Sequence, residues 1–88
     1  VNVGAMEQIV HHGKGLLPVG IINIEGSFQA GDVVLMVSEH GDAFAKGLVS
    51  YSADELRRIA GLRTSQVASV LGYKPADEVI HRDNLVLL

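Results

Sequence analysis

Apolar residues near the start of the chain recur at the spacing of one helix face. Val3, Met6 and Val10 form a stripe three to four residues apart, and polar residues fill most of the positions between them. Asn2 stands directly before the stripe, where its side-chain oxygen can accept a hydrogen bond from the first turn. The pattern predicts a short helix over residues 2–12, which the glycines that follow bring to an end.

Three strands are predicted in the middle of the chain, from apolar and β-branched runs separated by turn residues. They cover residues 20–24, 33–37 and 43–50, and His40-Gly41-Asp42 has the composition of a hairpin loop between the last two. The second run is apolar throughout, so we expect burial on both faces or a place inside a closed barrel. Gly47 predicts a bulge or a close backbone approach in the third strand.

Ser52 and Glu55 have the spacing of a capping box at the start of a second helix. In this arrangement the serine hydroxyl and the glutamate carboxylate each accept a hydrogen bond from the backbone amide of the other residue. Arg58 lies four residues after Asp54 and three after Glu55, so the helix offers it a local acidic partner. Gly61 is expected to stop this helix.

A further short helix is predicted to begin at Thr64 or Ser65 and to end at Gly72, with Tyr73 folding back on its apolar face. Residues 79–88 then predict a closing strand that a polar tetrapeptide interrupts. The order is helix, three strands, two helices and a strand. It indicates an α+β fold, mainly β, built as a small pseudo-barrel decorated by short helices.

Composition narrows the class of protein. The 88 residues fit one domain, span 1–88 without a repeat, and contain no cysteine. No apolar run approaches the ~20 residues of a membrane helix and no secretory leader opens the chain, so we expect no membrane partner and a cytoplasmic location. The chain begins with valine rather than methionine. We therefore expect a domain taken from a longer protein, with a processed small protein as the alternative.

Three features invite a chemical interpretation. Residues 81–84 (His-Arg-Asp-Asn) match part of a protein-kinase catalytic loop, but the other kinase motifs are missing, so we expect a polar turn in which Asp83 and Asn84 bond to backbone. Gly13-Lys14-Gly15 lacks the spacing and the preceding strand of a phosphate-binding loop and is better explained as a helix end. None of the four histidines has metal-site spacing: they are His11, His12, His40 and His81.

Basic residues provide the one candidate binding surface. The net charge of −3 argues against a broad phosphate-tracking surface, since nucleic-acid binders usually carry clustered positive charge. Solvated, independent side chains are the alternative. The residues that could converge in space to contact RNA or a protein partner are Lys14, Arg57, Arg58, Arg63 and Lys74.

Two stretches resemble the PUA module, namely residues 15–21 (Gly-Leu-Leu-Pro-Val-Gly-Ile) and 25–34, with its Gly-x-Phe-x-x-Gly-Asp pattern. Two further motifs restrict the resemblance to one group of PUA domains. They are Leu71-Gly72-Tyr73 and the His-Arg-Asp-Asn tetrapeptide, which together look like the PUA domain that ends bacterial glutamate 5-kinases. The resemblance covers nearly the whole chain. It departs from the family at Gly15, where serine is common, and in the loop at Pro75.

The resemblance implies a parent enzyme that uses ATP and magnesium to phosphorylate glutamate in proline biosynthesis and forms a homo-oligomer. Its catalytic machinery would lie in an N-terminal amino-acid-kinase domain outside these residues. We therefore expect no catalytic, cofactor-binding or metal-binding residue in this chain. The expected role is accessory and regulatory, with the kinase domain of the same polypeptide as partner. The alternative is an RNA-binding module, which is the function of PUA domains elsewhere.

Overall fold

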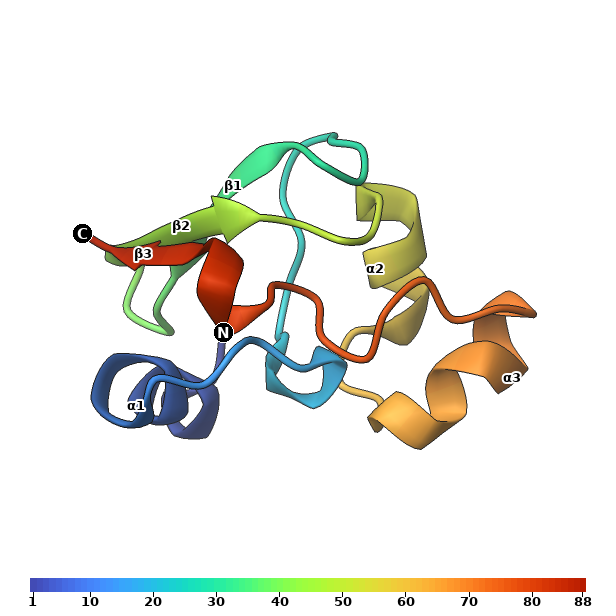
Figure 1. The fold of residues 1–88 in the computed structure, drawn as a ribbon, viewed down its shortest axis with the longest axis horizontal. Coiled ribbons are helices and arrows are strands. Elements are labelled where there is room, and N and C mark those ends of the chain that lie inside the picture. Colours follow the sequence, from blue (N-terminus) through green and yellow to red (C-terminus); the bar gives the residue numbers. More distant parts are fainter.

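A three-stranded antiparallel sheet lies at the centre of the computed structural model, which describes residues 1–88. The strands are β1 (Val33–Val37), β2 (Ala43–Leu48) and β3 (Leu85–Leu87), and β2 lies between the other two. A tight turn joins β1 to β2, whereas about 36 residues separate β2 from β3. The first two strands are therefore a local hairpin, and the third closes the fold from the end of the chain (Figure 1).

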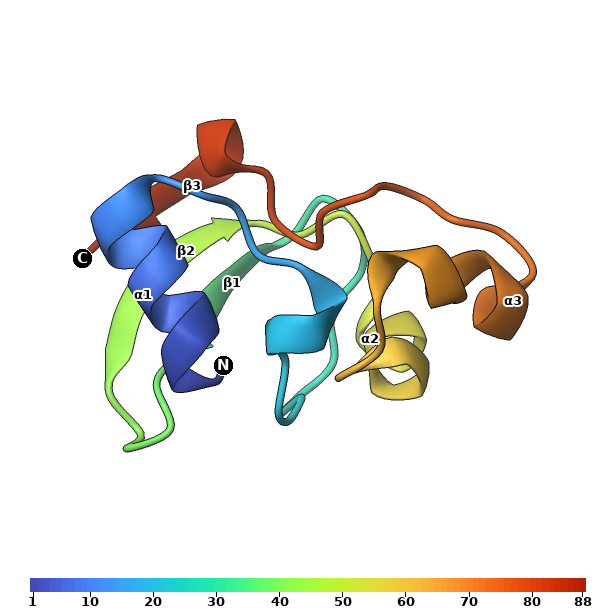
Figure 2. The same ribbon diagram turned by 90° about the horizontal axis from the view of Figure 1, so that it is seen from below.

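The helices divide between the two ends of the molecule. α1 (Val3–His12) covers one face of the sheet, while α2 (Ala53–Ile59) and α3 (Val67–Leu71) lie beside each other at the far end (Figures 1 and 2). None of these helices is long and apolar enough to cross a bilayer. The predicted α+β class is confirmed. Three short 3₁₀ turns complete the structure: Pro18–Gly20, Thr64–Gln66 and Arg82–Asn84.

Both ends of α1 follow the sequence prediction. The Asn2 side-chain oxygen accepts a hydrogen bond from the Ala5 amide at 2.8 Å, so one unpaired amide of the first turn is satisfied. Gly13 closes the helix in the left-handed conformation, with φ of 60°, where a residue without Cβ is not strained.

The two later helices are capped as expected at the start of α2 and at the end of α3. Ser52 and Glu55 form both bonds of the capping box, and Gly72 ends α3 at φ of 85°. The predicted start of the third helix was wrong in detail. Neither Thr64 nor Ser65 caps it; instead the Gln66 side chain accepts from the Arg63 amide at 3.0 Å and begins a 3₁₀ turn that leads into α3.

The strand predicted over residues 20–24 does not form. Pro18 opens a 3₁₀ turn instead, because its fixed φ suits the first position of a helical turn, and the Ile21 amide donates to its carbonyl at 3.1 Å. The residues after the turn have no ladder partner, and Ile22 is exposed. A β-branched run therefore remains irregular where no neighbouring strand is available to pair with it.

Burial of β1 on both faces was also wrong. Met36 faces the core, but Val33 and Leu35 are 64% and 60% exposed. α1 covers the inner face of the sheet, and neither a helix nor a second sheet covers the outer face (Figures 1 and 2). The apolar run thus gives the sheet two apolar faces, only one of which is buried within this domain.

Backbone hydrogen bonds extend the sheet toward a barrel beyond the regular strands. β2 ends at Leu48 rather than residue 50, yet the Ser50 amide still donates to the Val79 carbonyl at 2.8 Å. The Val79 amide donates to the Leu16 carbonyl at 2.7 Å, and the Leu16 amide donates to the Ile80 carbonyl. The predicted closing segment 79–80 thus forms an isolated bridge to the loop after α1 rather than a full strand.

One apolar core joins the sheet to the helices. Tyr51 lies fully inside it and donates its hydroxyl hydrogen bond to the Ala76 carbonyl, which satisfies the polar end of a buried ring. Gly47 makes the close backbone approach that the sequence predicted, against Ile80 and the Asn84 carbonyl. The thirteen core residues are Ile9, Leu16, Ile21, Met36, Ala45, Val49, Tyr51, Leu56, Ile59, Val67, Leu71, Val79 and Ile80.

Candidate functional site

The two predicted arginines of α2 are adjacent in sequence, and each contacts a different acceptor within the domain. Arg57 contacts the Asp54 carboxylate at 3.3 Å and donates to the Gly26 carbonyl. Arg58 was expected to pair with an acid of its own helix. Its Nη2 instead donates to the Val70 carbonyl at 2.6 Å and so ties α2 to α3.

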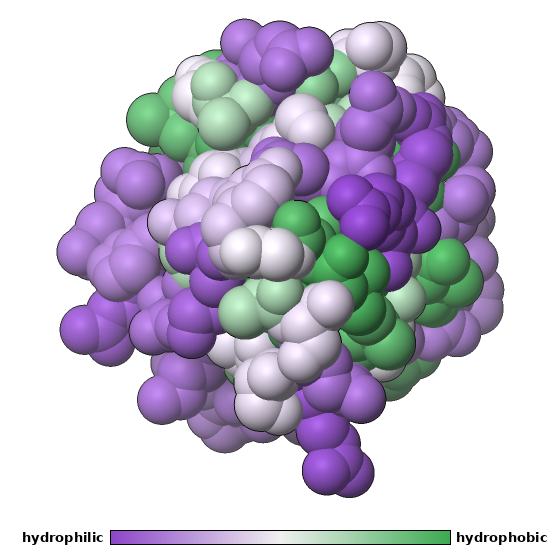
Figure 3. All heavy atoms as spheres, turned by 90° about the vertical axis from the view of Figure 1, so that its right-hand side faces the viewer, coloured by the Kyte–Doolittle hydropathy of each residue, from purple (hydrophilic) through white to green (hydrophobic).

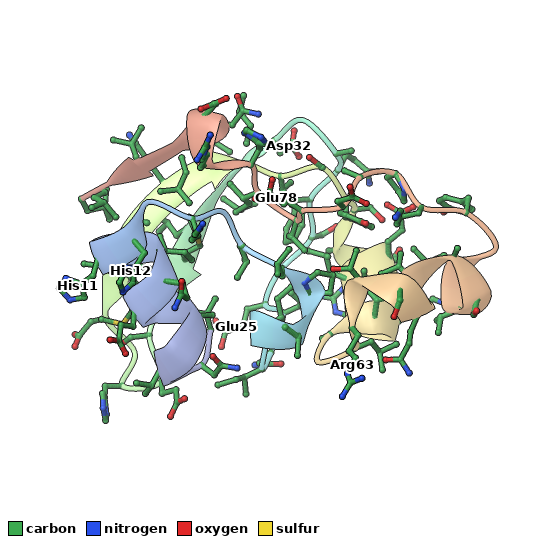
Figure 4. The ribbon with its side chains drawn as sticks, turned by 60° about the horizontal axis from the view of Figure 1, so that its bottom comes forward. His11, His12, Glu25, Asp32, Arg63 and Glu78 are labelled. Atoms are coloured by element: carbon green, nitrogen blue, oxygen red, sulfur yellow. The ribbon has the colours of Figure 1, made fainter.

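The other three predicted basic residues lie apart from one another in the structure. Lys74 forms an ion pair with Asp77 at 2.6 Å in the loop after α3. Arg63 lies between α2 and the 3₁₀ turn that precedes α3 (Figure 4). Lys14 follows α1, and its amide donates to the Gln8 carbonyl, which completes the end of that helix. Where the surface is viewed from the α2 and α3 end, it is mainly hydrophilic with interspersed apolar groups (Figure 3).

A shallow hollow of about 420 Å³ lies beside the start of α2. A tyrosine and a carboxylate meet there, because the Tyr73 hydroxyl donates to Glu55 Oε2 at 2.5 Å while Glu55 Oε1 accepts from the Ser52 amide at 2.8 Å. Tyr73 remains half exposed and contacts α2 through this hydrogen bond, whereas the packing of its ring on α3 stays a prediction. We call the site the α2 hollow; it is lined by Gln29, Ala30, Ser52, Asp54, Glu55, Arg58 and Tyr73.

The carboxylate and the phenol in the α2 hollow shift each other's pKa in opposite directions. Burial alone would raise the pKa of Glu55, but hydrogen bonds from Ser52 and Tyr73 outweigh it and the net pKa is lowered. The pKa of Tyr73 is raised, chiefly because its hydroxyl donates to that carboxylate. Both shifts favour the state with Glu55 ionised and Tyr73 neutral, in which the hydrogen bond joins α2 to the segment after α3.

The Glu55–Tyr73 contact should make the stability of the fold depend on pH in the acidic range. A carboxyl group whose folded pKa is depressed stabilises the fold above its ordinary value of 4.5, and this contribution is lost as pH falls through the folded pKa. Tyr73→Phe removes one of the two groups that depress that pKa. The loss of melting temperature between neutral pH and a pH below the ordinary carboxyl value should therefore be smaller in Tyr73→Phe than in the parent chain. An equal loss in both proteins, measured by thermal denaturation, would contradict this.

A larger hollow of about 730 Å³ lies between α1 and the segment before β3. His81 organises its wall: Nδ1 accepts from the Asp83 amide at 3.1 Å, and Nε2 lies 3.5 Å from Glu78 Oε1. We call it the α1 hollow. Its charged and polar lining residues are Asn2, Gln8, Lys14, Glu78, His81 and Arg82.

The His-Arg-Asp-Asn tetrapeptide forms a polar turn that its own backbone amides hold. The Asn84 amide donates to the His81 carbonyl at 2.9 Å, and the Asp83 amide donates to the His81 imidazole. The bond at Asp83 therefore comes from its backbone amide, whereas a bond from its side chain to the backbone was expected. His81 is thus the cap of a 3₁₀ turn, a role that sequence spacing did not reveal. The alternation of carboxylates and imidazole at Glu78, His81 and Asp83, within six residues, was the available signal.

The histidines do not assemble into a metal site. His11 and His12 extend from α1, at the opposite end of the molecule from α2 and α3, and Glu78 and Asp32 lie apart from both (Figure 4). No group of three or more His, Cys, Asp or Glu side chains is placed to hold a metal ion. The polar residues of the chain are therefore distributed over turns, helix ends and two open hollows.

Comparison with known proteins shows which domains this chain resembles. The PUA domain family matches residues 1–71. Over all 88 residues the chain is 51% identical to the glutamate 5-kinase of Caldanaerobacter subterraneus subsp. tengcongensis and 50% identical to that of Syntrophus aciditrophicus. It is 52% identical over 87 residues, 99% of its length, to the glutamate 5-kinase of Syntrophotalea carbinolica.

The matched region is a minor part of each relative. The chain covers 24%, 23% and 23% of those three kinases, so it spans about a quarter of the length of the curated relatives that it matches. Within them it matches the C-terminal PUA domain.

Proposed function

Since the chain belongs to the PUA domain family, we propose that it serves as the non-catalytic, regulatory C-terminal domain of a glutamate 5-kinase. The parent enzyme would transfer a phosphoryl group from ATP to the side-chain carboxylate of L-glutamate, the first reaction of proline biosynthesis, in the cytoplasm. The supporting observation is the identity of about 50% over the whole chain to relatives of which it forms only a quarter.

The internal arrangement of polar groups supports an accessory role. Glu55, Tyr73 and Arg58 hold α2 and α3 together, and His81 caps a turn. Phosphoryl transfer depends on positioned cations and a base around the phosphates. Here each prominent polar cluster is tied to helix ends and backbone carbonyls instead.

The groups that this chain offers support a location of ATP and magnesium in another domain. The Gly13-Lys14-Gly15 segment follows a helix rather than a strand, and the Lys14 amide donates a hydrogen bond to the Gln8 carbonyl at the end of α1. A phosphate-binding loop needs a run of free amides before a helix. No acidic cluster is placed to hold the metal ion. We place both ligands in the kinase domain of the parent enzyme.

Removing the domain from the full-length enzyme tests this function. A version that ends before Val1 should keep glutamate phosphorylation, while its inhibition by proline, its magnesium response or its thermal stability changes. The intact enzyme assayed in parallel is the control. Loss of the chemical step itself, with the kinase domain still folded, would show that this domain carries catalytic groups. No change in any of the four properties would remove the regulatory role.

RNA binding is the second candidate, and one observation favours it. Lys14, His81 and Arg82 line the α1 hollow, where a phosphate could lie between them. Glu78 shares the same wall, and Arg57 and Lys74 are already paired with acids. The accessory role predicts that the 88-residue chain retains no structured RNA even at low salt, where phosphate contacts are strongest.

A further inference from the structure

The outer face of the sheet is apolar and uncovered. Side chains that are paired across antiparallel strands project from the same side, and the register pairs Val33 with Leu48. It also pairs Leu35 with Lys46 and Lys46 with Val86. The four apolar members are 42–64% exposed. We call this surface the outer face; it consists of Val33, Leu35, Lys46, Leu48 and Val86.

A single cation stands at the centre of the outer face. Lys46 lies on the middle strand, flanked by Leu35 on one side and Val86 on the other. No ion pair joins its ammonium group to an acid of this chain. An apolar surface with one central positive charge is complementary to an apolar surface that carries one carboxylate.

The size of the outer face favours a tethered occupant over a second copy of the chain. Five residues of strand span about 16 Å and three strands about 14 Å, which gives roughly 200 Å². A stable interface between free proteins buries about 800 Å² on each partner. A patch this small can still be covered when partner and domain share one polypeptide, because linkage raises their effective concentration.

The start of the chain lies beside the same sheet. The Val1 amino group donates to the Val37 carbonyl at 2.7 Å, at the end of edge strand β1, and the Val3 amide donates to Glu39 Oε1 at 2.8 Å. In a parent enzyme of the proposed kind, the polypeptide that precedes Val1 would therefore reach this domain at the edge of the sheet. A domain attached at that point can reach the outer face without crossing the molecule.

We propose that the outer face is the docking surface for the kinase domain of the same polypeptide, with Lys46 meeting a carboxylate of that domain. The inference rests on the proposed function, since it requires the parent to be such a kinase. It assigns the contact to the sheet rather than to either hollow. The regulatory signal between the domains would then pass through β1 and β2.

Thiol labelling of the full-length enzyme tests the docking. This chain contains no cysteine, so Leu35→Cys places one reactive group on the outer face, and Ser69→Cys places a control on the exposed surface of α3. Labelling by iodoacetamide is followed by mass spectrometry of the modified peptide. Leu35→Cys should react about tenfold or more slowly in the full-length enzyme than in the 88-residue chain, because interface cores pack as densely as interiors. Ser69→Cys should react equally in both.

Two further variants test the role of the charge. In full-length Leu35→Cys enzyme, Lys46→Glu should restore fast labelling, because it would place two carboxylates together, while Lys46→Arg should keep the protection. Equal labelling of Leu35→Cys in the two proteins would overturn the docking surface. Labelling of Leu35→Cys could instead already be slow in the 88-residue chain and become slower as the concentration of that chain rises. This result would assign the outer face to a second copy of the chain and overturn the kinase domain as its occupant.

The labelling result is independent of the regulatory role. Protection of Leu35→Cys in an enzyme whose truncation changes nothing would support docking while the proposed regulation fails. Fast labelling in an enzyme whose truncation alters proline inhibition would leave the regulation intact and reject this surface.

Discussion

Replacing Ile59 with alanine should destabilise the domain by about 2–5 kcal/mol, the usual cost of removing most of a buried isoleucine side chain. Ile59 is completely buried at the end of α2 and belongs to the core cluster that joins that helix to the sheet. A small domain has only about 0.05–0.15 kcal/mol of stability per residue, so this loss is a large fraction of the total free energy of unfolding. The free energy of unfolding, measured by urea denaturation of the 88-residue chain, checks the value.

Ile59→Val is the matched control, because it removes a single methylene from the same position. It should cost about 0.5–1.5 kcal/mol. If alanine cost no more than valine, Ile59 would not fill the core as the structure shows. If the proposed function holds, Ile59→Ala in the full-length enzyme should shift its regulatory properties in the same direction as removal of the domain.

Gly47→Ala should also be strongly destabilising, by about 1–3 kcal/mol, because the new methyl group has no room. Its Cβ would lie 2.6 Å from the Asn84 carbonyl oxygen and 2.7 Å from Ile80 Cγ2. The first of these is backbone, so β2 and the turn before β3 would have to separate. Thermal denaturation should show a fall in melting temperature of about 4–8 °C for each kcal/mol lost.

Gly4→Ala is the control for the glycine substitution. Gly4 lies in α1, and the nearest atom to its added Cβ would be Asn2 Oδ1 at 3.6 Å, an ordinary contact. Alanine there should stabilise the chain by roughly 0.5–1 kcal/mol through helix propensity. A melting temperature that falls equally in Gly4→Ala and Gly47→Ala would reject a specific clash at the sheet.

Helix ends were the part of the fold that the sequence predicted best. Asn2, the Ser52–Glu55 pair and Gly72 all act where expected, because capping depends on residues within one turn of one another. Features that depend on distant partners were missed. The run at residues 20–24 has strand propensity but no strand beside it, and β1 has the composition of a doubly buried strand but only one covered face.

The candidate sites were less predictable for the same reason. Arg58 had two acids at helical spacing, yet the Val70 carbonyl of α3 holds it, and Tyr73 reaches Glu55 across eighteen residues. Linear spacing describes one element at a time. It contains no information on which elements lie side by side, so neither hollow nor the outer face could be derived from it.

The contrast between the two tyrosines gives the domain a built-in optical reporter. The chain has no tryptophan, Tyr51 is enclosed and bonded to the Ala76 carbonyl, and Tyr73 is half open to water. In Tyr73→Phe the tyrosine contribution to the near-ultraviolet signal comes from Tyr51 alone. Its loss would follow melting of the interior specifically, and no dye or added fluorophore would be required.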